Sequence, residues 1–172
     1  MPGLIPAARL ELVPLAVAHA EEMAGVLADP ALHRFIGGVP PDLDALRARY
    51  ARQSAGSPDP AVLWGNWVLR PRATGRLVGT VQATVEDGVA EVAWVIGTAW
   101  QGHGYATEAA RALVARLTEP VGAAAVHTVV AHIHPDHRAS AAVAAACGLA
   151  PTREAVDGEV RWRLRAAPRA GG

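Results

Sequence analysis

Apolar and polar residues alternate along this chain with two different periods, and the change of period divides it into short strands and amphipathic helices. A period of two predicts a strand with one buried face, and apolar residues three or four positions apart predict a helix. Strands are predicted at 9–13, 64–70, 76–85, 89–96, 126–133, 149–156 and 159–165. Helices are predicted at 17–27, 43–53, 104–117 and 139–147, with a short helical turn at 31–36.

Turn and capping residues separate these elements. Asp42 is placed to cap the helix that follows it, because an aspartate oxygen can accept hydrogen bonds from the free amides of a first turn. Asp87-Gly88 and Asp157-Gly158 each lie between two strand patterns, which is the sequence signature of a β-hairpin. The run 126–133 is almost wholly apolar or β-branched, which predicts an interior strand. No repeat, linker or change of composition divides the chain, so one domain, 1–172, is predicted.

Composition narrows the classes of partner. The 172 residues include 16 basic and 16 acidic side chains, so no broad positive field favours nucleic acid as a partner. Cys147 is the single cysteine, which excludes an internal disulfide and suits a small buried residue. No segment approaches the roughly 20 apolar residues needed to cross a bilayer. The N-terminus also lacks the basic start and long apolar run of a signal peptide, so we expect a cytoplasmic protein with no membrane partner.

The segment Gln101-Gly102-His103-Gly104-Tyr105-Ala106 joins an apolar strand pattern to an alanine-rich helix. Glycine lets the backbone approach a ligand without a Cβ clash, and the first amides of a helix have no partner inside it. Such amides lie at the positive end of the helix dipole and bind anions, phosphate above all. The segment matches neither the Walker pattern nor Gly-x-Gly-x-x-Gly. It fits Gln/Arg-x-x-Gly-x-Gly/Ala, with Gln101, Gly104 and Ala106 at the defining positions.

Through this motif the chain resembles the GNAT acyltransferases, which hold the diphosphate of acyl-coenzyme A on such a segment. The likeness covers about residues 8–165 and is greater toward the RimJ/RimL branch, through the blocks 91–96 and 100–109. A third block ends in Ser140, which matches the branch, but it has His137 where asparagine is usual. The resemblance implies an α/β fold of the α+β type, with a mixed, largely antiparallel central sheet flanked by helices.

The resemblance also implies an activity and a set of coenzyme contacts. A GNAT enzyme moves an acetyl group from acetyl-CoA to a primary amine by direct attack and without a metal; the amine here would be a protein N-terminus or a small molecule. The backbone of Trp94, Val95 and Ile96 is expected to bind the acyl carbonyl and pantetheine. The diphosphate is expected on Gln101, Gly102, His103, Gly104, Tyr105 and Ala106, with His137 at a further coenzyme contact. The acceptor pocket is expected to form from 35–41, 43–50 and 155–160.

Two residues are candidates for proton transfer. Glu91 begins a strand block where the branch often places a catalytic glutamate, and it is the predicted base. Deprotonating the substrate at pH 7 costs about 1 kcal/mol for an α-amine and roughly 4.6 kcal/mol for a lysine, so a weak base acting through water suffices. Ser140 is the candidate acid beside the leaving thiolate. Glu108 lies in a first helical turn, where an acid is favourable to the dipole, and is expected to be structural.

Two alternative functions remain open from the sequence. His132-x-His134-x-Asp136-His137 is the zinc signature of the metallo-β-lactamase fold, although no further histidine follows His137 as that fold requires. A zinc metallohydrolase is therefore the first alternative, and the zinc content of the protein would identify it. A catalytically silent acyl-CoA-binding sensor is the second. The sequence is compatible with a monomer or a homodimer.

Overall fold

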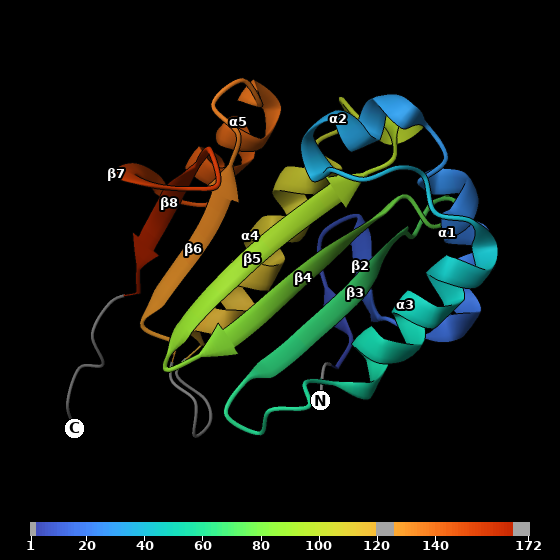
Figure 1. The fold of residues 1–172 in the computed structure, drawn as a ribbon, viewed down its shortest axis with the longest axis horizontal. Helices are drawn as coiled ribbons and strands as arrows, with labels where there is room; N and C mark the ends of the chain where they lie inside the picture. Colours follow the sequence, from blue (N-terminus) through green and yellow to red (C-terminus); the bar gives the residue numbers. More distant parts are fainter. Residues whose placement is uncertain (1–2, 120–125, 167–172) are drawn as a thin grey trace.

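The computed structural model describes residues 3–119 and 126–166, which build an eight-stranded sheet (Figure 1). The strands are β1 (Ile5–Pro6), β2 (Leu10–Pro14), β3 (Leu63–Pro71), β4 (Gly79–Glu86), β5 (Val89–Ile96), β6 (Thr128–Ile133), β7 (Ala150–Val156) and β8 (Glu159–Arg165). Their order across the sheet is β1-β2-β3-β4-β5-β6-β8-β7. Neighbouring strands are antiparallel except β5 and β6, which run parallel. The predicted fold class is confirmed.

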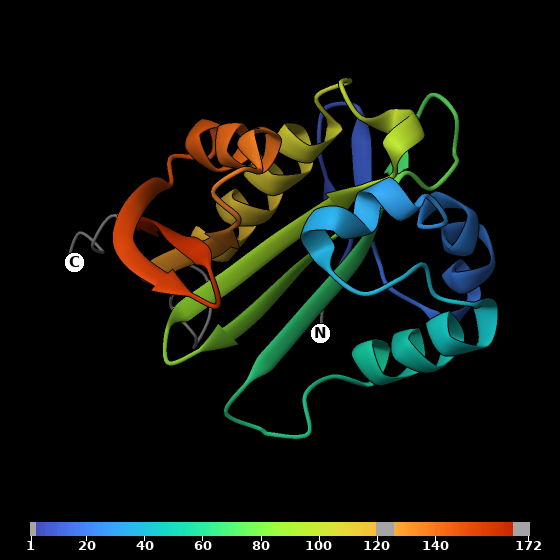
Figure 2. The same ribbon diagram turned by 45° about the horizontal axis from the view of Figure 1, so that its top comes forward.

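Helices cover both faces of this sheet (Figures 1 and 2). The α-helices are α1 (Ala20–Val26), α2 (His33–Ile36), α3 (Leu43–Ala55), α4 (Tyr105–Thr118) and α5 (Arg138–Ala146), and the short 3-10 turns are η1 (Val17–His19), η2 (Pro30–Leu32) and η3 (Thr98–Trp100). One face carries α4 and α5 and the other carries α1 and α3, because their apolar residues pack on opposite sides of the strands. Among the described residues, no helix is both long enough and apolar enough to cross a membrane.

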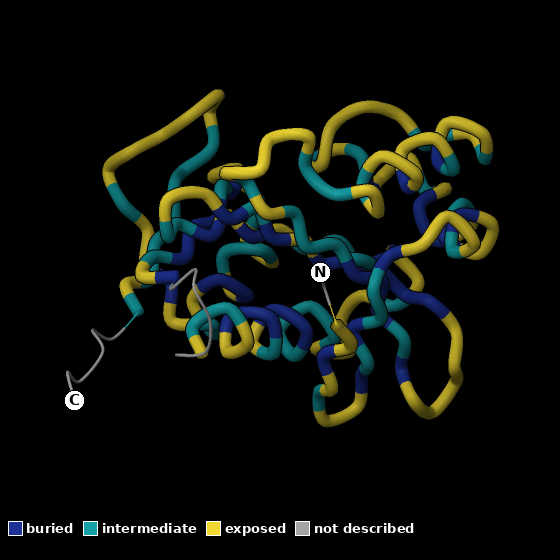
Figure 3. Tube along the Cα trace, turned by 90° about the horizontal axis from the view of Figure 1, so that it is seen from below, coloured by how far each residue is buried: buried dark blue, intermediate teal, exposed yellow. Residues whose placement is uncertain are grey.

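Two apolar cores lie on the two faces, and Figure 3 shows buried chain running between the exposed outer segments. Under α4 and α5, Val92 of β5 belongs to the same core as Leu113 of α4. Under α1 and α3, the completely buried Val68 of β3 shares a core with Met23 and Leu46. Truncating a buried side chain of this size to alanine costs about 2–5 kcal/mol, so both helical layers are firmly attached to the sheet.

The turn and capping signals act as the sequence predicts. Both Asp87-Gly88 and Asp157-Gly158 have positive φ at the two central positions, which is the backbone of the tight turn that matches the twist of a hairpin. Asp42 caps α3 by accepting a hydrogen bond from the Ala45 amide at 2.7 Å. β6 pairs with β5 on one side and β8 on the other, so the prediction of an interior strand is confirmed.

The sequence pattern missed one strand and misplaced some element ends. β1 was not predicted, because two residues are too short to show a period. The predicted strand 76–85 is observed as Gly79–Glu86, because the Leu77 amide donates to the Glu22 carboxylate at 2.8 Å instead of to a neighbouring strand. The predicted helix 17–27 begins with the 3-10 turn η1 before α1, and the predicted strand 126–133 begins only at Thr128.

Candidate functional site

The parallel strands β5 and β6 separate after three residue pairs. The last pair joins Glu91 to Val130, whereas β5 stays paired with β4 as far as Ile96. The Gly97 amide donates to the Val78 carbonyl on the β4 side at 2.9 Å. Because backbone groups alternate along a strand, the amides of Trp94 and Ile96 point the other way, into the gap. This half of β5 is therefore an open edge with hydrogen-bonding groups facing a space between two strands.

A glycine-bearing loop lies at the end of this open edge. Gly102 and Gly104 both have φ of +78°, a conformation that suits glycine. The Gln101 side-chain amide donates to the Ile96 carbonyl at 3.0 Å, and the His103 ring bonds the Gln101 carbonyl through Nδ1 at 2.9 Å. The first of these hydrogen bonds attaches the loop to the end of β5, and the second lies within the loop.

The loop ends at the first turn of α4, which has free amides. The Glu108 amide donates to the Gly104 carbonyl at 3.1 Å and makes the first hydrogen bond of the helix. The amides of Tyr105, Ala106 and Thr107 precede it and have no partner within the helix. Free amides at the positive end of the dipole of a 14-residue helix are an arrangement that favours an anion.

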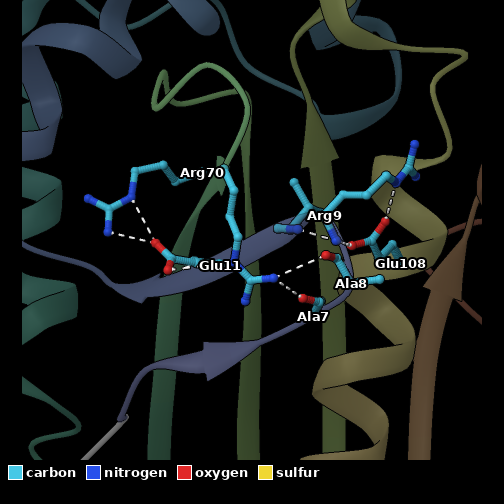
Figure 4. A network of polar contacts seen from close by, with 8 residues as sticks. Ala7, Ala8, Arg9, Glu11, Arg70 and Glu108 are labelled. Atoms are coloured by element: carbon cyan, nitrogen blue, oxygen red, sulfur yellow. Dashed lines mark hydrogen bonds and ion pairs between the residues drawn. The ribbon is translucent and has the colours of Figure 1, made fainter.

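Glu108 ties the start of α4 to the start of β2 (Figure 4). Its carboxylate accepts hydrogen bonds from the Arg9 amide at 2.5 Å, the Arg9 Nε at 2.7 Å and the Leu10 amide at 3.0 Å. Burial alone would raise the pKa of Glu108, but these hydrogen bonds and the Arg9 charge outweigh it and hold the pKa below its usual value. These contacts support the structural role expected for Glu108.

Arg9 was not singled out from the sequence, yet it lies beside the glycine loop. Its guanidinium is over the Tyr105 ring, 5.2 Å from the centroid. A Cβ at Gly104 would stand 3.4 Å from Arg9 Nη2, so the cation is close to the loop backbone. More than half of the Arg9 side chain is exposed, which leaves its charge accessible to an anion on the loop.

A cleft of about 460 Å³ opens on the sheet face that carries α1 and α3. Five residues of the predicted site, from β5 and from the β6–α5 region, line it: Glu91, Trp94, Val95, His137 and Ser140. The opposite wall includes the segment from Phe35 to Val39 together with Arg49, Tyr50 and, from β8, Glu159. Each of the three segments predicted to form an acceptor pocket thus contributes to this cleft. The residues 101–106 do not line it; they lie at the far end of the open strand edge.

The polar residues of the cleft make few contacts with one another. Glu91 Oε1 is 3.3 Å from His132 Nδ1. His137 caps α5, since its Nδ1 accepts from the Ser140 amide at 3.4 Å, and its ring stacks on Phe35 with centroids 4.1 Å apart. Ser140 itself is half-buried in the first turn of α5. The cleft therefore presents a carboxylate, an imidazole and a hydroxyl to a molecule bound within it.

The histidines of the predicted zinc signature are engaged separately. His132 pairs with Glu91, His134 accepts from the Asp136 amide through Nδ1 at 3.1 Å, and His137 caps a helix. Across residues 3–119 and 126–166, no three His, Cys, Asp or Glu side chains gather as ligands for a metal ion.

Tyr50 ends the segment 43–50 that was predicted to line the acceptor pocket, and it lines the cleft. Its side chain is almost fully buried, and its hydroxyl has no hydrogen-bond partner among the described residues. Burial raises its pKa to about 12, so the phenol stays neutral. Buried hydroxyls are rarely left unpaired, which makes this group a candidate contact for a ligand in the cleft.

Comparisons with known proteins place this arrangement in a family. The sequence model of the family described as "Acetyltransferase (GNAT) domain" matches residues 9–150. A GNAT-family acetyltransferase from Bacillus anthracis has a TM-score of 0.78 at 18% identity, covering 95% of this chain and 99% of that one. An acetyltransferase from Agrobacterium tumefaciens has a TM-score of 0.76 at 25% identity, covering 96% and 95%. The RimL ribosomal L7/L12 alpha-N-protein acetyltransferase in complex with coenzyme A has a TM-score of 0.77 at 16% identity, covering 95% and 98%.

A search of curated proteins found no match. The family match nevertheless spans most of the chain, and the solved structures share its fold along nearly their whole length. The matched residues include the open edge of β5, the glycine loop and the start of α5. The chain therefore belongs to the GNAT family of acetyltransferases.

Proposed function

We propose that the protein transfers an acetyl group from acetyl-CoA to a primary amine. The observation that carries this proposal is the open edge of β5, which has the glycine loop beyond its end and a cleft lined by Glu91 along it. Together these offer an anion site and proton-transfer groups, as a thioester with a diphosphate tail requires. Family membership supports the same activity.

The residues present fit coenzyme A. Gly102 has open space where a Cβ would stand, and the amides of Tyr105 and Ala106 are free to bind the diphosphate. We assign Gln101, Gly102, His103, Gly104, Tyr105 and Ala106 to that group. The open edge of β5, at Trp94, Val95 and Ile96, binds pantetheine and the acyl carbonyl, and an amide there stabilises developing negative charge on the oxygen. His137 provides a further contact. The coenzyme supplies the activated acyl group.

Two side chains of the cleft move protons in this proposal. Glu91 provides the base function that removes a proton from the ammonium form of the substrate. Ser140 donates a proton toward the sulfur as the thiolate leaves. The amine attacks the acyl carbon directly, without an acyl-enzyme intermediate. Removing the proton costs between about 1 and 5 kcal/mol at pH 7, depending on the amine, and this is small beside ordinary enzymatic rate gains.

The acceptor lies in the cleft bounded by α2, α3 and β8. Two classes of primary amine are candidates, namely a protein N-terminus and a small molecule. Structural likeness to RimL, a ribosomal-protein N-acetyltransferase, supports the first class, and likeness to the microcin C7 self-immunity acetyltransferase MccE supports the second.

Calorimetry with acetyl-CoA and a thiol-release assay over N-terminal peptides and small amines test the proposal. We expect saturable heat with the wild-type protein, weaker binding for Gly104→Ala, and unchanged binding for Gly75→Ala. Gly75 is a matched control because its φ of +68° imposes the same strain in a distant turn. No heat at millimolar coenzyme overturns the proposal. Binding without thiol release for any amine overturns the transfer step and identifies a silent binder.

A further inference from the structure

Glu91 and His132 come together through the pairing of β5 with β6. Glu91 is opposite Val130, and because side chains two residues apart share a face, His132 projects from the same face one step further along β6. Glu91 Oε1 and His132 Nδ1 are 3.3 Å apart. The carboxylate is 58% exposed, whereas the imidazole is only 21% exposed and lines the cleft. The histidine is thus the more enclosed member of the pair.

The carboxylate determines which ring nitrogen is available. The negative charge of the carboxylate, 3.3 Å from Nδ1, attracts a proton on that nitrogen and so favours the tautomer with the proton on Nδ1. The other nitrogen, Nε2, then carries a lone pair. In the described part of the chain, Glu91 is the one acidic group within 4.0 Å of this ring, and the ring belongs to the lining of the cleft. An imidazole held this way by a carboxylate is arranged to accept a proton.

We propose that His132 takes the proton from the ammonium group of the substrate and that Glu91 is the residue that orients and charge-compensates its ring. This inference rests on the proposed acetyl transfer and refines it, since Glu91 then acts through His132 and is a positioning residue. The match of proton affinities favours this order. Histidine is the side chain that most often serves as a general base in enzymes, and a neutral imidazole is a stronger base toward an ammonium ion than a carboxylate is.

Few charged groups lie near the His132 ring in the described part of the chain. Arg161 of β8 is directly opposite His132 and would repel an imidazolium, but its guanidinium is paired with Glu154 at 2.7 Å. Glu91 is the compensating charge once the ring accepts a proton. The remaining charged or titratable groups that line the cleft are His33, Arg49, Tyr50, His134, His137 and Glu159.

The protons and bonds of the transfer step balance. The ammonium group gives one proton to Nε2, and its nitrogen lone pair forms the C–N bond with the acyl carbon. The C–S bond breaks with its electron pair on sulfur. The amide nitrogen loses a second proton as the thiolate gains one, through Ser140 or water. The imidazolium of His132 then releases its proton to solvent, so one proton is produced for each acetyl group transferred.

Substitutions in the full-length protein test this inference. His132→Gln is expected to lower kcat/KM for the amine by roughly 10²-fold or more, as loss of a general base does, while acetyl-CoA binding measured by calorimetry stays unchanged. Glu91→Gln is expected to lower it by a smaller factor. The double variant should match His132→Gln within about 3-fold, because residues that act as a unit are not additive. His127→Gln is the matched control, since His127 lies at the other end of β6 and is exposed.

Two further measurements separate catalysis from structure. The fall of kcat/KM toward acid pH should be lost in His132→Gln and retained in His127→Gln. The ring-nitrogen NMR signals of His132 in the free protein should change in Glu91→Gln and not in Glu86→Gln, which alters an exposed glutamate on β4. If His132→Gln keeps kcat/KM within about 3-fold of wild type while Glu91→Gln does not, the inference is overturned but the proposed function stands. If the wild-type protein binds acetyl-CoA but acetylates no amine, the proposed function itself fails.

Discussion

Replacing Glu108 by alanine is expected to destabilise the protein mainly through the backbone amide of Leu10 rather than through a lost ion pair. The carboxylate is 14% exposed and accepts from the Arg9 amide, the Arg9 Nε and the Leu10 amide. Leu10 is completely buried, whereas Arg9 is largely exposed. Water can therefore replace Glu108 at the Arg9 groups but has limited access to the Leu10 amide.

The magnitude follows from this difference. A buried donor left without a partner costs about 1–3 kcal/mol, and a largely exposed ion pair contributes about 0–1 kcal/mol. We expect Glu108→Ala to lower the free energy of unfolding by about 2–3 kcal/mol. Glu108→Gln keeps an oxygen that can accept from the Leu10 amide, so its loss should be nearer 1 kcal/mol. Glu119→Gln, at an exposed glutamate, should change it by less than about 0.5 kcal/mol.

The effect should also depend on pH in a defined direction. The pKa of Glu108 lies below its usual value in the folded protein, so its stabilisation is complete above the ordinary carboxyl pKa of 4.5 and is lost as pH falls through the lower folded value. Urea unfolding followed by circular dichroism, at pH 7 and in steps below 5, measures this. The difference between wild type and Glu108→Ala should shrink toward acid pH. A difference under 0.5 kcal/mol at pH 7, or one that is constant with pH, would refute the reasoning.

The remaining predictions concern the loop and the cleft. Gly104→Ala should lower stability by about 1–2 kcal/mol, because φ is +78°, and should raise the Kd for acetyl-CoA in calorimetry; Gly75→Ala should show only the stability loss. Tyr50→Phe should leave the midpoint of urea unfolding unchanged or raised, since the hydroxyl has no partner in the described residues, while the KM for the amine rises. In wild type, burial and then the His134 charge lower the pKa of His137. The stability that the neutral His137 ring provides is therefore complete above pH 6.5 and is lost as pH falls through the lower pKa of the folded protein. His137→Asn should keep the cap of α5 and abolish that loss, measured by thermal unfolding between pH 7.5 and 5.

Local signals account for the part of the fold that the sequence predicted. The hairpin turns at Asp87-Gly88 and Asp157-Gly158 and the cap at Asp42 each depend on a few neighbouring residues, and each is found where expected. The errors arose where a distant residue decides the local structure. Leu77 leaves the sheet because Glu22, 55 positions away, accepts its amide, and no period in the sequence carries that information.

The candidate site also has a part that neighbouring residues predict and a part that depends on distant ones. The glycine loop and its helix are contiguous in sequence, so the motif predicted them together. The opening between β5 and β6 depends on how residues 89–91 pair with 128–130, and the Glu91–His132 contact follows from that pairing. The sequence offered His132 only as part of a zinc motif. Val130 and His132 lie on the same face of β6, which is a feature of the sequence. That His132 meets Glu91 could be deduced from it only with the register of β5 against β6, two strands that are distant in the chain.

The histidine that replaces the expected asparagine at position 137 is explained by the segment opposite it. An asparagine side chain could cap α5, but it offers no aromatic face, whereas His137 does both: its Nδ1 accepts from the Ser140 amide and its ring stacks on Phe35 of α2. Near the other end of the gap, the Thr98 hydroxyl donates to Asp29 just before α2, at 2.6 Å. The segment 29–35 is therefore anchored on both sides of the gap, to η3 beyond β5 and to the start of α5 beyond β6. A wall of the acceptor cleft fixed in this way restricts how an amine can approach Glu91 and His132, so His137 contributes to the shape of the site even though its polar atom is used to cap a helix.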